Sequence, residues 1–139
     1  MSKFIVLKKR KDFLRAAKDI TVITHNVMLQ AARPLSVSEE MRQARIGFTA
    51  TKRLGKANVR NRVKRRLRAI VREVYEKLAL PNIDYVLVGR LSTINCTFSE
   101  LQGDVKYAFK KANKQILAET TEDETETTQD VKKNSDSAD

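Results

Sequence analysis

The clearest pattern of apolar positions lies in residues 58–79, where apolar and basic side chains repeat with the period of an α-helix. The apolar residues of this segment fall within about 120° of arc at 100° per residue. Asn58 is a suitable N-cap, and Pro81 marks the end of the pattern. The segment is therefore predicted to be a long helix that packs along one side. Its apolar stripe consists of Val59, Val63, Leu67, Ile70, Val71, Val74 and Leu78.

Two further segments have helical periodicity. In residues 9–18, Phe13, Leu14 and Ala17 fall on one side and basic residues on the other, which predicts a short helix. Thr97 and Glu100 have the spacing of a capping box, which predicts that a last helix begins at residue 98 and runs to residue 118. The apolar stripe of this last helix consists of Leu101, Val105, Ala108, Phe109, Ala112 and Ile116.

Three segments are typical of β-strands. Residues 20–31 are rich in β-branched and apolar side chains but are interrupted near residues 24–26, which predicts two short strands or one bulged strand. Residues 45–51 alternate between apolar and other side chains, as a half-buried strand does. Residues 83–90 contain a continuous apolar stretch, which indicates a strand buried on both faces.

The connections between these elements are polar. Residues 33–43 form one such connection, and Gly55 in the basic loop at 52–57 suits a turn with positive φ. The elements follow one another in the order α-β-β-β-α-β-α, without an internal repeat. This order predicts a single sheet with helices packed on it, an α+β or α/β sandwich. We expect the α+β class, with a central sheet of four strands.

The chain has 139 residues and a net charge of +11 that is distributed unevenly. Residues 1–118 hold 26 Lys and Arg against 9 Asp and Glu, a net +17, and we expect them to form one domain with a real core. Residues 119–139 hold 2 against 8, a net −6, with one Val and one Ala as their apolar side chains. This composition predicts a disordered acidic tail. Two interpretations of the tail stay open, a solubilising appendage or a segment that transiently covers the basic face and competes with a polyanion.

The basic residues gather in one part of the chain. Between Arg42 and Arg72 there are twelve basic residues and no acidic one. Guanidinium groups donate hydrogen bonds in a fixed fork that matches phosphate oxygens, so a rigid helix with many of them is suited to bind a polyanion. The alternative is a solvated helix face, but such faces normally mix Glu with Lys at i,i+4 spacing. Arg62, Arg65, Arg68 and Arg72 lie opposite the apolar stripe, with Lys64 and Arg66 beside them and Arg60 in the first turn.

Arrangements of residues that cleave bonds are missing from the sequence. The single histidine, His25, and the single cysteine, Cys96, exclude an internal disulfide and any cluster of His or Cys around a metal. We interpret His25 as a structural residue of a strand or loop and Cys96 as a small buried apolar residue. The acidic residues of the domain are scattered, and Gly55 alone is no phosphate loop. The chain therefore has no evident means of cleaving a bond by itself, although it can support a reaction that another molecule performs.

The short apolar runs and the single cysteine predict where in the cell the protein is found. The longest apolar run near the start, residues 4–7, is followed directly by four basic residues. Such a run is too short for a signal-peptide core or a membrane helix, so we expect no membrane association. A single cysteine fits a reducing compartment, and we expect a cytoplasmic protein.

The central stretch from Arg45 to Arg68 is similar to the signature of the bacterial ribonuclease P protein subunit. That signature is a strand that ends in Lys, a Gly turn, and then Arg-Asn-Arg-x-Lys-Arg-x-x-Arg on a long helix. The resemblance extends to LKKRKDF at residues 7–13 and to DYVLVGR at residues 84–90, and it covers roughly residues 7–117. The helical part of the signature is matched by Arg60, Asn61, Arg62, Lys64, Arg65 and Arg68.

The resemblance implies a fold and an activity. The family has the element order already predicted, with a left-handed strand-helix-strand crossover at the signature helix. Its catalyst is a large RNA that uses Mg²⁺ and hydrolyses a phosphodiester to mature the 5′ end of transfer RNA. The expected partners are this catalytic RNA and precursor tRNA, with one protein for each RNA. No catalytic residue and no protein-bound metal are expected in the chain itself.

The resemblance also implies two binding surfaces. The catalytic RNA is expected on the basic helix and the loop before it, and the single-stranded 5′ leader in a cleft between the first helix and the sheet. The cleft has Ala17 and Gln30 where the family often has aromatic residues, so we expect it to depend more on charge than on base stacking. The RNA-binding residues are expected to be Lys52, Arg53, Lys56, Arg60, Asn61, Arg62, Lys64, Arg65, Arg66, Arg68 and Arg72, and those of the leader cleft Phe13, Ala17, Gln30, Arg45 and Arg90.

Three other classes of protein stay as alternatives. A structural RNA-binding protein, such as a ribosomal protein, would also carry a basic helix. A sequence-reading DNA regulator is disfavoured because the sequence has no helix-turn-helix spacing. A self-sufficient nuclease is disfavoured because the chain has no set of catalytic groups.

Overall fold

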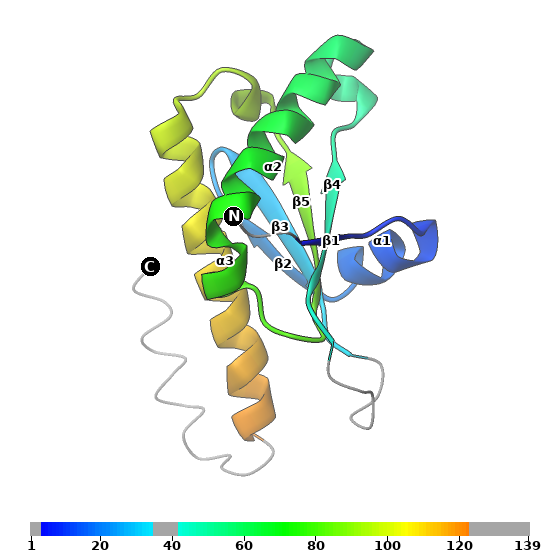
Figure 1. Ribbon diagram of the computed structural model, residues 1–139, viewed down its shortest axis with the longest axis vertical. Coiled ribbons are helices and arrows are strands. Elements are labelled where there is room, and N and C mark those ends of the chain that lie inside the picture. The colour runs from blue at the N-terminus through cyan, green and yellow to red at the C-terminus, as the bar shows by residue number, and fades with distance from the viewer. Residues whose placement is uncertain (1–3, 35–41, 123–139) are drawn as a thin grey trace.

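The computed structural model describes residues 4–34 and 42–122, with side chains as far as residue 118. The described chain forms one mixed sheet and three α-helices (Figure 1). The strands are β1 (Ile5–Val6), β2 (Ile20–Ile23), β3 (Val27–Ala32), β4 (Arg45–Thr49) and β5 (Asp84–Gly89). The helices are α1 (Arg10–Ala17), α2 (Ala57–Leu78) and α3 (Phe98–Glu122), with short 3₁₀ turns η1 (Lys52–Leu54) and η2 (Leu91–Ile94).

The sheet has the strand order β1-β4-β5-β3-β2. β4 pairs in parallel with β1 and β5, and β3 pairs antiparallel with β2 and β5. Because α2 joins the parallel neighbours β4 and β5, it forms a strand-helix-strand crossover, whose hand stays a prediction. The α+β class is confirmed, but the sheet has five strands where we expected four. The fifth is β1, whose two residues are too few to show a periodic pattern and which exists through its pairing with β4.

The two faces of the sheet are covered differently. One face packs against α2 and α3, which run side by side over the sheet, while α1 lies apart from them at the right of Figure 1. This face contains the main core, in which the largest fully buried side chains include Tyr85, Phe109, Leu29 and Leu67. The opposite face carries a much smaller buried cluster under α1, formed by Leu7, Ala16, Ala32 and Val86. The apolar pattern of β5 on both faces is thereby explained, since the strand lies between both clusters.

Most predicted boundaries are close to the observed ones. Residues 20–31 form two strands, the first of the two alternatives, and Gly55 has a φ of 139° as its turn requires. The capping box is confirmed, because the Thr97 N–H donates to Glu100 Oε1 at 3.2 Å and the Glu100 N–H donates to Thr97 Oγ1 at 3.1 Å. Asn58 as N-cap is wrong: α2 begins at Ala57, with Lys56 at the N-cap position.

The acidic tail begins later than its composition indicates. α3 continues to Glu122, so the backbone of the first four residues of the expected tail is helical. Helical hydrogen bonding can extend beyond the last apolar residue that packs on the sheet, which is why the apolar stripe underestimates the length of the helix. The rest of the expected tail, residues 123–139, lies outside the described residues, as does the segment 35–41 of the polar connection.

The contact between α2 and β5 depends on a glycine, and this leads to a first prediction. A Cβ at Gly89 would overlap Val63 Cγ1 in the buried interface. We expect Gly89→Ala to lower the free energy of unfolding by about 1–3 kcal/mol, since overpacking a close-packed core costs about this much. Urea denaturation measures the effect. The matched control is Gly103→Ala on α3, where a Cβ meets nothing within 4 Å and where alanine should be neutral or stabilising. Equal stability of the two variants would contradict this prediction.

Candidate nucleic-acid interface

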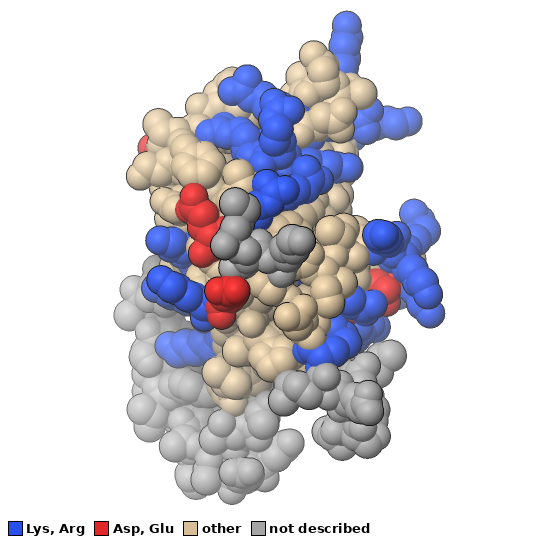
Figure 2. All heavy atoms as spheres, in the orientation of Figure 1, with Lys and Arg blue, Asp and Glu red and all other residues tan. Residues whose placement is uncertain are grey.

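The helix α2 presents a basic surface because its apolar stripe is used completely by the core. Val63, Leu67, Ile70 and Val74 are buried against the sheet and α3, so the intervening basic side chains must face outward. Figure 2 shows Lys and Arg gathered over the N-terminal half of α2 and again over α1. Exposed residues of this basic surface are Lys52, Arg53, Lys56, Asn61, Arg62, Arg65 and Arg72, and half-buried ones are Arg60, Lys64, Arg66 and Arg68.

The exposed arginines of α2 are available to a partner. The side chains of Arg62, Arg65 and Arg72 form no hydrogen bond or ion pair with any other residue that the structure describes. Their guanidinium groups are held on a helix whose other side is fixed in the core, so they are presented on a rigid support. Such an array can donate to several phosphate groups with little loss of conformational freedom in the backbone.

Three other basic residues of α2 are engaged within the protein. The Arg66 guanidinium donates to the carbonyl oxygens of Thr93 at 2.8 Å and Ile94 at 3.0 Å, and also to that of Cys96. It therefore fixes the end of η2 to α2, and we separate it from the residues expected to contact RNA. Arg60 Nε donates to the Gly55 carbonyl at 3.2 Å, which ties the glycine turn to the helix.

Arg68 is engaged through an aromatic ring. Its guanidinium carbon lies 5.3 Å from the centroid of the Phe48 ring, a cation–π distance. Phe4 packs against the same Phe48 with ring centroids 5.9 Å apart. Arg68 thus covers one edge of the core and keeps part of its guanidinium at the surface.

A second surface lies on the sheet face that carries α1. Phe13 of α1 rests over β4, where the absence of a side chain at Gly47 makes room for its ring: a Cβ there would lie 2.6 Å from Phe13 Cε1. Gln30 of β3 is half-buried on the same face, and its Nε2 lies 3.9 Å from Met28 Sδ. Two of the residues expected in the leader cleft, Phe13 and Gln30, are therefore on one face of the sheet.

This face ends in a hollow beyond α1. The hollow has a volume of about 670 Å³ and is lined by Arg53 of η1 and Arg90 after β5, with Met28 and Val88 among its apolar residues. Its lining also includes the polar residues His25, Thr51 and Ser92, so the hollow combines cationic, polar and apolar groups, which suit a base and its phosphate. Arg90, which was expected in the leader cleft, lines this hollow, and its role there stays a prediction. Met28 and Val88 also line the hollow and were not expected there. The sequence did contain a sign of them. Alternate side chains of a strand point to opposite faces of the sheet, so every second residue of β3 and β5 lies on this second face.

Arg45 does not lie open in the cleft. Its Nε and one terminal nitrogen, Nη2, donate to the two carboxylate oxygens of Asp84 at 2.9 and 2.7 Å, and Nη2 also lies 3.7 Å from Asp12 Oδ2. Its guanidinium is thus held by carboxylates of the protein while its side chain stays 29% exposed, and its expected contact with the leader stays a prediction. Ala17, at the last position of α1, is exposed and is not part of the small cluster under that helix.

Asp84 was missed by the sequence analysis, which treated the acidic residues of the domain as scattered. Burial by itself raises the pKa of this carboxyl, but the hydrogen bond from Arg45 and the charges of Arg45, Arg42 and Arg15 outweigh burial and hold its pKa below the ordinary value. Asp84 is therefore ionised at neutral pH. A lone Asp at the start of a strand gives no signal of such a role, because its partners are distant in the sequence.

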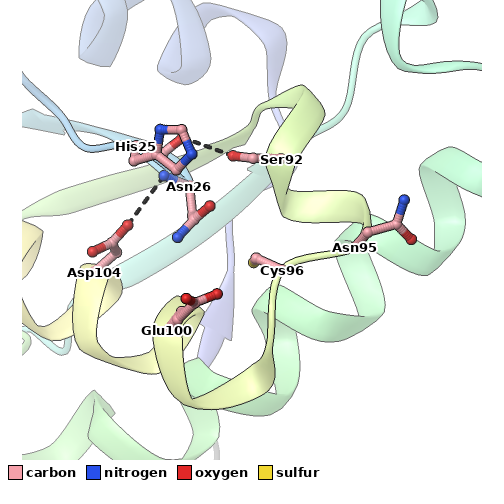
Figure 3. A pocket seen from close by; sticks show the side chains of 7 residues that line it. All are labelled: His25, Asn26, Ser92, Asn95, Cys96, Glu100 and Asp104. Carbon is pink, nitrogen blue, oxygen red and sulfur yellow. Dashed lines mark hydrogen bonds between the residues drawn. The ribbon is translucent and has the colours of Figure 1, made fainter.

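An acidic pocket lies next to the hollow, between the β2–β3 turn, η2 and the start of α3 (Figure 3). The Ser92 hydroxyl donates to the His25 carbonyl at 2.7 Å, and the Asn26 N–H donates to Asp104 Oδ2 at 3.1 Å. His25 is an exposed turn residue, as expected, whereas Cys96 is half-buried at the edge of the core, less buried than expected. Burial raises the pKa of the Cys96 thiol, which disfavours the nucleophilic thiolate.

The described residues contain no group of three His, Cys, Asp or Glu side chains that could hold a metal ion. Within the same part of the chain, no helix is both long and apolar enough to cross a membrane. The exposed guanidinium groups on α2 can bind, position and neutralise a polyanion.

The chain is similar to known proteins of one family. A family model described as "Ribonuclease P" matches residues 1–113. The chain is 43% identical over 107 residues to the ribonuclease P protein component of Gluconacetobacter diazotrophicus, an alignment that covers 76% of this chain and 89% of that protein. It is 41% identical to the ribonuclease P protein component of Ruegeria pomeroyi, covering 76% of this chain and 84% of that protein.

Solved structures show the same fold. The RNase P protein of Staphylococcus aureus aligns with a TM-score of 0.64 at 25% identity, over 79% of this chain and 96% of that chain. The RNase P protein of Thermotoga maritima aligns with a TM-score of 0.63 at 20% identity, over 76% of this chain and 96% of that chain. The latter likeness concerns the fold alone.

Proposed function

This chain belongs to the bacterial ribonuclease P protein family, and from this premise we propose that its α2 surface binds the catalytic RNA while the cleft beside α1 holds the 5′ leader of precursor tRNA. As a ribonuclease P protein component, it is part of the endoribonuclease that processes the 5′ ends of tRNA, with catalysis carried by the RNA subunit. Membership of this family disfavours the three alternatives, a ribosomal protein, a DNA regulator and a self-sufficient nuclease.

The observation that carries the proposal is the row of unpaired arginines on α2. Arg62, Arg65 and Arg72 are exposed, have no partner among the described residues, and are anchored by a buried helix face. A charged group without a protein partner lowers the stability of a domain with a net charge of +17 through self-repulsion. A polyanionic partner removes that repulsion. With roughly six neutralised phosphates, affinity should fall about 10³-fold between 50 and 200 mM salt.

The proposed leader cleft combines one aromatic ring with charge. Phe13 offers a face for stacking, and the hollow between Arg53 and Arg90 offers two cations beside apolar side chains. Base stacking contributes about 1–3 kcal/mol per base. Because Phe13 is the one Phe or Tyr of the described residues at the cluster under α1, we expect the cleft to select single strands more by charge and by the absence of a second strand than by base identity.

The Mg²⁺ ions of the reaction do not fit a site in the described part of this chain, which brings no three metal-ligating side chains together. We therefore assign them to phosphate oxygens of the catalytic RNA and its substrate. The protein contributes cations that hold RNA phosphates close to one another. We further propose one protein for each catalytic RNA, a cytoplasmic location, an RNA-binding domain that contains residues 1–118, and an acidic tail that follows α3 in the sequence.

Reconstitution with the catalytic RNA of the same cell tests the proposed function. Cleavage of precursor tRNA is measured at low and at high Mg²⁺, with the RNA alone, the protein alone, and both. We expect the protein to raise cleavage by the RNA strongly at low Mg²⁺ and weakly at high Mg²⁺, since its cations replace divalent ions. Cleavage by the RNA-free protein, or equal activity of the RNA with and without protein at low Mg²⁺, would contradict the proposal.

A further inference from the structure

The helix α1 makes few apolar contacts with the sheet. It has eight residues, and the buried cluster beneath it includes from α1 only Ala16 and part of Phe13. Leu14 and Ala17 are exposed. A helix of this length has little stability of its own, because isolated helices shorter than about 12–15 residues are marginal in water. Other interactions must therefore set the position of α1 relative to the sheet.

A buried carboxylate supplies these interactions. Asp84, at the first position of β5, is fully buried and accepts hydrogen bonds from three arginines of different segments. Arg45 of β4 binds both of its oxygens, Arg15 of α1 donates to Oδ2 at 2.9 Å, and Arg42 donates to Oδ1 at 3.2 Å. The carboxylate thus joins α1, β4 and the segment before β4 at one point.

Two further contacts extend this cluster along α1. Arg45 Nη2 also lies 3.7 Å from Asp12 Oδ2 of α1, and Arg15 Nη1 donates to the Arg33 carbonyl at 2.7 Å. Arg33 in turn pairs with Asp19, just after α1, at 2.6 Å. The helix is therefore attached by polar contacts along its length, and Asp84 is the one fully buried carboxylate among them.

We propose that Asp84 is a positioning residue for leader binding: through Arg15 and Arg45 it holds α1, and with it the Phe13 ring over Gly47, at the separation from the sheet that a single strand needs. This inference rests on the proposed leader cleft. Without the carboxylate, three guanidinium groups face one another in a partly buried place, and breaking such a buried pair is strongly unfavourable. The helix that moves most easily is α1, because it is held by the fewest apolar contacts.

The direction in which leader binding changes in Asp84→Asn separates a positioning role from an effect of net charge. Asp84→Asn keeps the shape of the side chain and raises the net charge of the protein by one. An added positive charge should strengthen the binding of any RNA slightly. Loss of leader binding in this variant would therefore have the opposite sign and would require a change in geometry.

The experiment compares holoenzymes reconstituted with wild-type protein and with Asp84→Asn. Binding of leader-bearing precursor and of mature tRNA is measured, together with affinity for the catalytic RNA and amide hydrogen exchange of residues 10–17. We expect the preference for the precursor to fall about tenfold, affinity for the catalytic RNA to stay within about twofold, and exchange in α1 to become faster. The matched control is Asp104→Asn, a half-buried aspartate outside the cluster, which should leave the preference unchanged.

A second variant keeps the inference testable should Asp84→Asn fold poorly. Arg15→Gln removes the contact of α1 with Asp84 and leaves the carboxylate with Arg42 and Arg45. The double variant combines Asp84→Asn with Arg15→Gln. If both residues act by holding α1, it should lose no more leader preference than Asp84→Asn alone, because the two substitutions remove the same interaction. Unchanged preference and exchange in folded Asp84→Asn or Arg15→Gln, or additive losses in the double variant, would overturn the inference. If the wild-type holoenzyme had no leader preference, the proposed cleft would be contradicted instead. Amide exchange in α1 would then test only whether Asp84 holds this helix.

Discussion

Replacing Arg62, Arg65 and Arg72 together by Ala is expected to weaken binding to the catalytic RNA about 100-fold at near-physiological salt. Each of these guanidinium groups is free of protein partners in the described chain, so its removal costs the contact with phosphate and little else. At about 1 kcal/mol for each hydrogen-bonded contact, three contacts amount to about two orders of magnitude in affinity. The slope of log affinity against log salt should fall by about 2–3, since each phosphate contact contributes about 0.7–0.9.

Filter binding over a range of salt concentrations measures both quantities. The matched control is the triple variant Lys77→Ala, Lys106→Ala and Lys110→Ala, which removes the same charge from the groove between α2 and α3. It should lose much less affinity than the arginine variant. Equal losses would mean that net charge, and not the exposed row on α2, determines binding.

Arg66→Ala should behave differently again, lowering thermal stability because three carbonyl oxygens at the end of η2 lose their donor.

Phe13→Ala is expected to reduce the preference of the holoenzyme for leader-bearing precursor over mature tRNA about 30-fold. The ring lies over Gly47 at the surface of the cleft, and stacking on an aromatic side chain contributes about 1–3 kcal/mol per base. Among the described residues, Phe13 is the one Phe or Tyr that packs against the small cluster under α1. Mature tRNA has no leader, so its binding should change little. Equilibrium binding of the two RNAs to the reconstituted holoenzyme gives the ratio.

Two variants control for loss of packing. Phe98→Ala removes an exposed phenylalanine at the start of α3, away from α1, and should leave the ratio unchanged. Gly47→Ala would place a Cβ 2.6 Å from Phe13 Cε1, so the ring must move, and part of the preference should be lost without any change to Phe13 itself. If Phe13→Ala weakened binding of precursor and mature tRNA equally, the ring would belong to the core of the protein and not to the leader surface.

The basic helix shows how far periodicity can predict a site. Residues that repeat every 3.6 positions must share one side of a helix, so the buried stripe of Val63, Leu67 and Val74 determines that Arg62, Arg65 and Arg72 point away from it. Both the helix and its exposed arginines could therefore be predicted before any tertiary contact was known. The same pattern could not separate Arg62 from Arg66. That difference depends on η2, a segment about 27 residues later that places three carbonyl oxygens beside Arg66.

The charges near α1 show the opposite case. The family resemblance implied that Arg45 lies in the leader cleft, and Asp84 was taken as one scattered acid. The parallel pairing of β4 with β5 sets the two residues directly opposite each other in register, where they form a bidentate ion pair. Register between strands 39 residues apart is a property of the folded sheet, and local composition contains no information about it.

The sequence by itself determined the α+β class, the element order, the long basic helix and the polyanionic partner, because periodicity and charge are local properties that secondary structure converts directly into surfaces. The tertiary structure alone decided which arginines are free and which are bound inside the protein, added the edge strand β1, and brought Asp12, Arg15, Arg42 and Arg45 around Asp84. Those outcomes depend on pairing and packing between distant segments, whose energies arise only when the sheet and its helices come together.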